Sequence, residues 1–220
     1  MTGFASWLNT AFSGFDYALL SFYHGWAQGA SGFLTPFMQV ISAFSYKGLA
    51  LIALGLILLL FSKTRKIGVG VLVALLINFL LTNLLLKTVI ARPRPYTFDE
   101  YKGWWELVGA TVEKDKSFPS GHTALMSSAM MAIFLNSKNK KWTWLCIIPV
   151  ILMGISRNYL MVHYPTDVLG GIISGFMAGA ISFAIVHYSF KAIEKRQENG
   201  FCKFVINADV TNLFRKNSAN

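Results

Sequence analysis

The stretch IGVGVLVALLINFLLTNLLL, residues Ile67 to Leu86, has no charged side chain in 20 consecutive positions. An α-helix needs about 20 mostly apolar residues to cross the ~30 Å hydrocarbon core of a bilayer, so this stretch predicts a membrane-spanning helix. The whole chain has the same character, since 54% of its 220 residues are hydrophobic and only 14% are charged. Soluble domains carry about 25% charged residues. We therefore expect an all-α integral membrane protein, built as a helical bundle.

Further apolar runs on either side of this stretch indicate more spans. They are Gly48–Phe61, Leu125–Leu135, Trp142–Ile155 and Val168–Phe190. The shorter runs must include neighbouring residues, such as 44–47 before the first and 121–124 before the second, to reach across a bilayer. We expect five transmembrane helices in this core, over residues 46–190.

The N-terminal 45 residues make a poor span. Asp16 and His24 lie within the otherwise aromatic segment Phe12–Gln28, and such side chains are costly in hydrocarbon. Aromatic residues such as Trp7 suit the headgroup region instead. We therefore expect an interfacial or re-entrant helical segment over residues 1–45, with a sixth transmembrane helix as the alternative.

The net charge of +10 is concentrated in short connectors between the apolar runs. Three connectors are basic, and single crossings place all of them on one side of the membrane: Ser62–Lys66, Asn136–Lys141 and Lys191–Arg196. Because basic loops face the cytoplasm, this pattern predicts a multi-pass plasma-membrane protein rather than one with a nucleic-acid partner. Residues 191–220 then form a basic cytoplasmic tail, with one short surface helix expected at Phe201–Phe214.

Polar motifs gather at the opposite, extracytoplasmic ends of the spans. They are KTVIARPRP (Lys87–Pro95), SFPSGHTA (Ser117–Ala124) and SRNYLMVHYPTD (Ser156–Asp167). Each alone has an ordinary explanation: basic side chains reach to headgroups, Ser and Pro start helices, and a single His is more often structural than catalytic. All three lie at one depth of one face, which weakens the separate explanations.

The cations and one helix start suit a phosphate group. Lys87, Arg94 and Arg157 can surround an anion, and the forked arginine side chain matches phosphate oxygens. The backbone amides of Ser120, Gly121 and His122, at the start of a helix, are expected to add an anion site. Arg92 either serves a diphosphate head or anchors the chain at the membrane interface, and we favour the anchor.

Two histidines and a carboxylate are expected to take separate catalytic roles. Asp167 lies four residues beyond His163, and Pro165 favours a helix start between them, so the carboxylate can orient the imidazole. His163 would attack phosphorus and form a phosphohistidine. His122 would protonate the leaving oxygen and later activate water. We expect neither a metal ion nor another cofactor.

The spacing of these residues resembles that of the type 2 phosphatidic acid phosphatase superfamily, from about Gly48 to Phe190. The matching patterns are Lys87-x6-Arg94-Pro95, Pro119-Ser120-Gly121-His122 and Ser156-Arg157-x5-His163-x3-Asp167. The resemblance implies a metal-independent phosphatase with a helical-bundle core and a site at the membrane surface. It implies His163 as the nucleophile, Asp167 as its orienting partner and His122 as the general acid, with phosphate bound by Lys87, Arg94, Ser120, Gly121 and Arg157.

Bacterial members of that family with outward-facing sites hydrolyse lipid phosphates and diphosphates. This chain looks most like the undecaprenyl-diphosphate phosphatases, with phosphatidylglycerophosphate and phosphatidic acid as alternative substrates. A transporter with an anion path, or a silent scaffold, is the alternative of another class. A transporter should distribute polar residues along its spans, and Asn78 and Asn83 are nearly all that occur there, so the enzyme is favoured. The preferred lipid and the oligomeric state are left open.

Overall fold

The computed structural model describes residues 2–212, in which the regular elements are all helical. The expected all-α class is confirmed. The helices are α1 (Gly3–Ala11), α2 (Ser13–Ala43), α3 (Leu49–Leu59), α4 (Arg65–Asn78), the π-helix η2 (Phe79–Leu86), α5 (Lys87–Ile90), α6 (Asp99–Val108), α7 (Gly121–Asn136), α8 (Lys140–Thr143), α9 (Ile147–Tyr159), α10 (Pro165–Glu194) and α11 (Gly200–Asn207). Short 3-10 turns occur at Tyr46–Gly48, Pro95–Thr97 and Trp144–Cys146.

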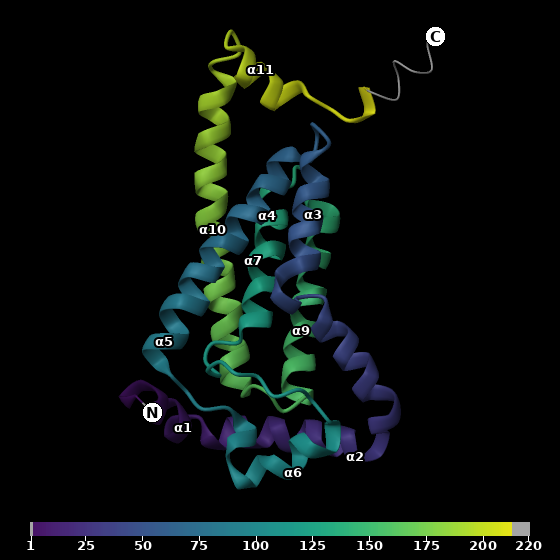
Figure 1. Ribbon diagram of the computed structural model, residues 1–220, viewed down its shortest axis with the longest axis vertical. Helices are drawn as coiled ribbons and strands as arrows, with labels where there is room; N and C mark the ends of the chain where they lie inside the picture. The colour runs from purple at the N-terminus through teal and green to yellow at the C-terminus, as the bar shows by residue number, and fades with distance from the viewer. Residues whose placement is uncertain (1, 213–220) are drawn as a thin grey trace.

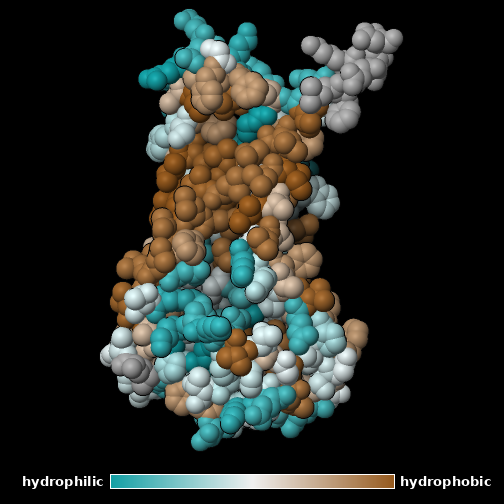
Figure 2. Space-filling model, in the orientation of Figure 1, coloured by the Kyte–Doolittle hydropathy of each residue, from teal (hydrophilic) through white to brown (hydrophobic). Residues whose placement is uncertain are grey.

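A hydrophobic band surrounds the bundle. Figure 2 shows apolar residues covering the middle of the molecule, with hydrophilic residues at both ends. Among the described residues, three helical stretches are long and apolar enough to cross a membrane: Ser13–Leu59, Arg65–Thr97 and Pro165–Glu194. The chain is therefore a multi-pass membrane protein, while the number of five spans stays a prediction.

Helix α2 changes direction midway. Ala30 has non-helical backbone angles (φ −148°, ψ 26°). An interruption of the helical hydrogen bonds at such a residue bends the helix sharply. The first half of α2 lies across the lower end of the bundle in Figure 1, together with α1 and α6, whereas the second half rises toward α3. The N-terminal segment therefore forms a platform beneath the upright helices.

Helices α7 and α10 pack at backbone distance. A Cβ atom added to Gly175 would lie 2.4 Å from the Ala124 carbonyl oxygen, and one added to Gly171 would lie 2.7 Å from that of Ser120. Any larger residue would push the helices apart, because real Cβ contacts are not this short. This close contact fixes the N-terminal ends of α7 and α10 beside each other, next to the platform.

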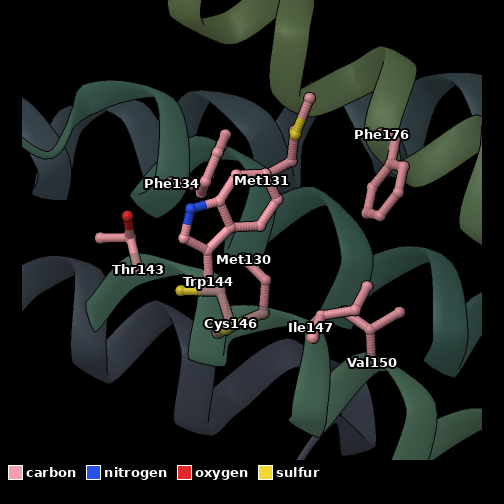
Figure 3. Close-up of a pocket in the computed structure, with 9 residues that line it drawn as sticks. All are labelled: Met130, Met131, Phe134, Thr143, Trp144, Cys146, Ile147, Val150 and Phe176. Atoms are coloured by element: carbon pink, nitrogen blue, oxygen red, sulfur yellow. The ribbon is translucent and has the colours of Figure 1, made fainter. Parts of the chain in front are cut away.

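An apolar cavity of about 290 Å³ lies between α7, α9 and α10 (Figure 3). Its walls include Met131 and Phe134, in the half of α7 farther from the platform, together with Trp144 and Phe176. None of its lining residues is charged. Its position and composition separate it from the polar motifs.

The end opposite the platform is tied together by the α3–α4 connector and the segment after α10. Arg65 donates hydrogen bonds to the carbonyl oxygens of Val205 (2.8 Å) and Ile206 (3.3 Å) in α11. The backbone N–H of Val210 donates to Leu60 O at 3.1 Å. Two of the three basic connectors therefore lie at one end. The expected surface helix is present as α11 and ends at Asn207, and the last two residues of its predicted range lie outside the described residues.

Candidate active site

The three sequence motifs converge at the platform end of the bundle. Lys87 follows the π-helix η2, and Arg94 follows α5. Arg157 lies in the last turn of α9, and His163 lies between α9 and α10, while His122 lies in the first turn of α7. The π-helix adds one residue per turn, a change of register that is frequent at functional sites, and it directly precedes Lys87.

The three cations are buried and share two carboxylates of the loop between α6 and α7. Asp115 forms ion pairs with both Lys87 and Arg94. Glu113 accepts a hydrogen bond of 2.5 Å from Arg157 Nη2 and lies 3.9 Å from Arg94 Nη2. Lys87, Arg94 and Arg157 therefore form one group, which we call the cation cage. Neither Glu113 nor Asp115 belongs to the three sequence motifs.

Arg157 has one donor to spare. Its Nη1 donates to Ser42 Oγ at 2.5 Å and its Nη2 to Glu113, but its buried Nε has no hydrogen-bond partner among residues 2–212. An unpaired buried donor costs free energy. The Arg157 Nε is therefore a candidate donor to an anion bound by the cage.

His163 is fully buried, with its two ring nitrogens in different surroundings. Arg94 Nη1 lies 3.2 Å from Nε2, and a guanidinium can only donate. Nε2 must then be the acceptor, which places the ring proton on Nδ1. Burial, followed by the charges of Arg94 and Arg157, lowers the pKa of His163 well below its ordinary value. The ring is therefore neutral, with a lone pair directed toward the cation cage.

Ser117 stands between His163 and Asp167. Its Oγ lies 3.4 Å from His163 Nδ1 and donates a hydrogen bond of 2.5 Å to Asp167 Oδ2. The direct distance from His163 Nδ1 to Asp167 Oδ2 is 3.6 Å. The sequence predicts a direct histidine–aspartate contact, whereas the structure adds a bridging hydroxyl. Ser117 was missed, although it opens the quoted SFPSGHTA motif.

Arg92 is buried, contrary to the expectation from its sequence position. The favoured interpretation, an anchor at the membrane interface, is wrong because Arg92 is 1% exposed. Its Nη1 pairs with Asp167 Oδ1 at 2.7 Å and its Nη2 with Asp16 Oδ2 at 2.8 Å. Its guanidinium also lies 3.9 Å from the centre of the Tyr164 ring. Two carboxylates and an aromatic ring hold the Arg92 side chain inside the protein, between Asp167 of α10 and Asp16 of the platform.

The start of α7 contributes less to an anion site than expected. The Ser120 amide donates to the Asp167 carbonyl oxygen at 3.0 Å, and the Ser120 hydroxyl is paired with Thr123 Oγ1 at 3.0 Å. These groups are already used to join α7 to α10. Gly121 does face the cage, since a Cβ there would lie 3.4 Å from Lys87 Nζ. His122 lies within electrostatic range of all three cage cations.

Known proteins resemble this chain in sequence. The family model described as the PAP2 superfamily matches residues 67–191. A protein of Sulfolobus acidocaldarius named undecaprenyl-diphosphatase is 34% identical over 59% of this chain, which spans 60% of that protein's length. Phosphatidylglycerophosphatase B of Bacillus subtilis is 32% identical over 78% of this chain and 71% of its own length.

A solved structure shares the fold. The crystal structure of a transmembrane PAP2-type phosphatidylglycerolphosphate phosphatase from Bacillus subtilis superposes with a TM-score of 0.66 at 26% identity, over 84% of this chain and 90% of the other. The family resemblance drawn from the three motifs is thereby confirmed. The chain belongs to the PAP2 superfamily.

Proposed function

We propose that this protein hydrolyses a lipid phosphate or diphosphate at the outer surface of the plasma membrane, through a phosphohistidine on His163. The observation that carries the proposal is the cation cage of Lys87, Arg94 and Arg157 beside the Nε2 lone pair of His163. Three buried cations can stabilise the charge on the equatorial oxygens of a transferring phosphoryl group, which is usually the largest contribution to such a reaction. Residues 46–190 would form this catalytic core.

The first chemical step forms a bond between His163 Nε2 and phosphorus while the bond from phosphorus to the leaving oxygen breaks. His122, protonated when the anionic substrate lies beside it, gives its proton to the leaving oxygen and becomes neutral. Nδ1 of His163 keeps its proton, directed at Ser117 and Asp167, so the carboxylate balances the positive charge of the phosphorylated ring. In the second step a water oxygen attacks phosphorus, the nitrogen–phosphorus bond breaks, and His122 accepts the proton of the water.

Undecaprenyl diphosphate is the favoured substrate. The undecaprenyl-diphosphatase of Sulfolobus acidocaldarius supports this choice by its similarity. Phosphatidylglycerophosphate is the second candidate, because the relative named phosphatidylglycerophosphatase B is matched over more of its length, and phosphatidic acid is the third. The hydrophobic band beside the site suits a substrate whose tail stays in the bilayer.

The test is phosphate release by the purified protein in detergent with excess chelator, from undecaprenyl diphosphate, phosphatidylglycerophosphate and phosphatidic acid in parallel. We expect turnover of at least one of them, fastest with undecaprenyl diphosphate. Reactions with labelled substrate should be stopped with acid or with base, and the label bound to the protein measured. A phosphohistidine intermediate survives base and is lost in acid. No release from any of the three lipids would overturn the proposal.

A further inference from the structure

Asp16 is a buried carboxylate outside all three motifs and outside the family-matched residues 67–191. It lies in the first turn of α2, on the platform, and is 2% exposed, whereas its neighbour Phe15 is 45% exposed. A carboxylate is buried at a large cost unless charged and hydrogen-bonding partners compensate it. Its partners therefore indicate why it is there.

The partners of Asp16 are on the two segments that carry the catalytic carboxylate and its counterion. Oδ2 pairs with Arg92 Nη2 at 2.8 Å and accepts from Thr166 Oγ1 at 2.8 Å. Oδ1 accepts from the backbone N–H of Thr166 at 2.9 Å. Thr166 is the second residue of α10, so Asp16 caps this helix from a different part of the chain, where a negative charge is favourable.

Arg92 connects Asp16 to Asp167. One guanidinium nitrogen pairs with Asp16, and the other with Asp167 Oδ1 and Thr166 Oγ1, each at 2.7 Å. The second oxygen of Asp167, Oδ2, is the one that faces Ser117 and His163. Arg92 therefore neutralises one carboxylate of a pair, and the group of two carboxylates and one guanidinium keeps a net negative charge beside the ring.

We propose that Asp16 is a positioning residue for His163, acting through Arg92 and Asp167. It holds Asp167 in register at the start of α10 and shares the charge of Arg92, so that Asp167 can balance the positive ring formed when His163 takes up a phosphoryl group. The inference rests on the proposed function, and it makes the platform helix α2 a part of the active site.

The test compares Asp16→Asn with wild type in the full-length protein. The variant keeps the shape of the side chain but removes its charge. We expect kcat to fall by about 10- to 100-fold. Losses of this size are typical when a residue that orients a metal-binding side chain is replaced, and Asp16 would orient His163 in a comparable way. We expect KM and inhibition by inorganic phosphate to change by less than about twofold, because Asp16 does not touch the cation cage. Inhibition by orthovanadate, which mimics the phosphoryl transition state, should weaken with kcat.

Two further variants separate positioning from folding. Asp99→Asn removes an exposed carboxylate from the first turn of α6, another helix of the same end, and should leave all of these parameters unchanged. Thr166→Val removes only the hydroxyl bonded to Asp16 and Arg92. It should lower kcat in the same direction even if Asp16→Asn does not fold.

A readout without catalysis distinguishes failure of the inference from failure of the proposed function. In protein labelled with ¹⁵N-histidine, the pH at which the His163 ring protonates should fall in Asp16→Asn, because less negative charge then faces the ring. An unchanged titration and an unchanged kcat would each overturn the inference. A fall in kcat together with a similar rise in KM and weaker phosphate binding would also overturn it, since that pattern indicates a merely structural role. Inactivity of the wild type, with the titration still shifted, would instead overturn the proposed function.

Discussion

At the scale of single residues, the site is organised around the neutral ring of His163. Arg94 can only donate to Nε2 at 3.2 Å, and Ser117 and Asp167 lie on the Nδ1 side at 3.4 and 3.6 Å. These contacts select one tautomer, and they leave the lone pair on the side of the cation cage. Protonation state and orientation are therefore set before any substrate arrives.

Replacement of the nucleophile gives the most direct prediction. His163→Ala should lower kcat by roughly 10³-fold or more, because the covalent route is removed while the cage remains. Phosphate release and base-stable labelling measure the two consequences, and thermal unfolding in detergent checks that the variant is folded. Substantial activity in a folded His163→Ala protein contradicts the phosphohistidine route.

The pH dependence of the reaction follows from the same residue. The pKa of His163 is lowered from its ordinary value of 6.5, first by burial and then by the charges of Arg94 and Arg157. A lowered pKa means that the nucleophilic neutral ring persists on the acidic side of 6.5. The acid limb of kcat/KM, measured with a substrate whose phosphate does not titrate between pH 5 and 7, should have its midpoint below pH 6.5. A midpoint above 6.5 contradicts the assignment.

The sequence predicted residue types better than residue partners. Lys87, Arg94 and Arg157 were selected by charge, and the structure brings them together. The pairing of Arg92 with Asp16 was not predictable, because the two residues are 76 positions apart and no local pattern links them. The role of Ser117 was equally unpredictable, because it depends on His163 and Asp167, which the fold places on either side of the hydroxyl.

At the scale of elements, the loop between α6 and α7 contacts the cation cage, in which the proposed mechanism holds the phosphate. Asp115 pairs with Lys87 and Arg94, and these two cations hold the pKa of its carboxyl below the ordinary value although burial alone would raise it. Glu113 forms an ion pair with Arg157. Any phosphate that enters the cage must displace these carboxylates or share their cations.

Neutralising this loop should therefore strengthen anion binding. Asp115→Asn removes a charge that competes for two cage cations, so inorganic phosphate should inhibit the variant at concentrations about tenfold lower than wild type. Product inhibition assays at constant ionic strength measure the change. Glu106→Gln, an exposed carboxylate of α6, provides the matched control. Weaker inhibition in Asp115→Asn would mean that this carboxylate helps to hold phosphate rather than competing with it.

The contact between α7 and α10 gives a stability prediction. Gly175→Ala places a methyl group 2.4 Å from the Ala124 carbonyl oxygen, so the helices must separate, at a cost of about 1–3 kcal/mol. Gly25→Ala, in a helix position with no atom within 4 Å of the added Cβ, should instead stabilise by about 0.5–1 kcal/mol. Thermal unfolding in one detergent compares the two. Equal shifts for both variants contradict the close contact.

Several elements could be expected from local sequence, and others could not. Pro165 marks the start of α10 as predicted, because its fixed φ suits a first helical turn. The π-helical register of Phe79–Leu86 was not foreseen, because its uniformly apolar side chains have the same pattern in either helix type. The bend at Ala30 was hidden for a similar reason, since alanine is a good helix former.

At the scale of the whole molecule, the site and the basic connectors lie at opposite ends of a hydrophobic band (Figures 1 and 2). The contacts of Arg65 with the carbonyl oxygens of α11 hold the basic end together. Positive residues favour the cytoplasm, so we propose that the platform faces outward. Composition alone predicted the membrane class, because the apolar fraction is a property of the whole chain.

Cysteine labelling tests this orientation. Lys102→Cys introduces a thiol at an exposed position of α6 on the platform, while the native Cys202 lies in α11 at the other end. A membrane-impermeant maleimide should label position 102 in intact cells and Cys202 only after lysis. Cys202 therefore serves as an internal control for membrane integrity. The reverse pattern would place the site on the cytoplasmic side.

The close contact of α7 with α10 also bears on how such a protein can diverge. His122 lies in the first turn of α7 and His163 lies two residues before α10, and the contact of Gly171 and Gly175 with backbone atoms fixes the spacing between these two helix starts. Under the proposed mechanism, a larger residue at this contact would shift the two histidines relative to each other and so disturb the reaction. The exposed residues of the platform and of the α6–α7 loop lie outside this contact, so we expect lipid preference to change there while Asp16 and the carboxylates that pair with the cage are kept.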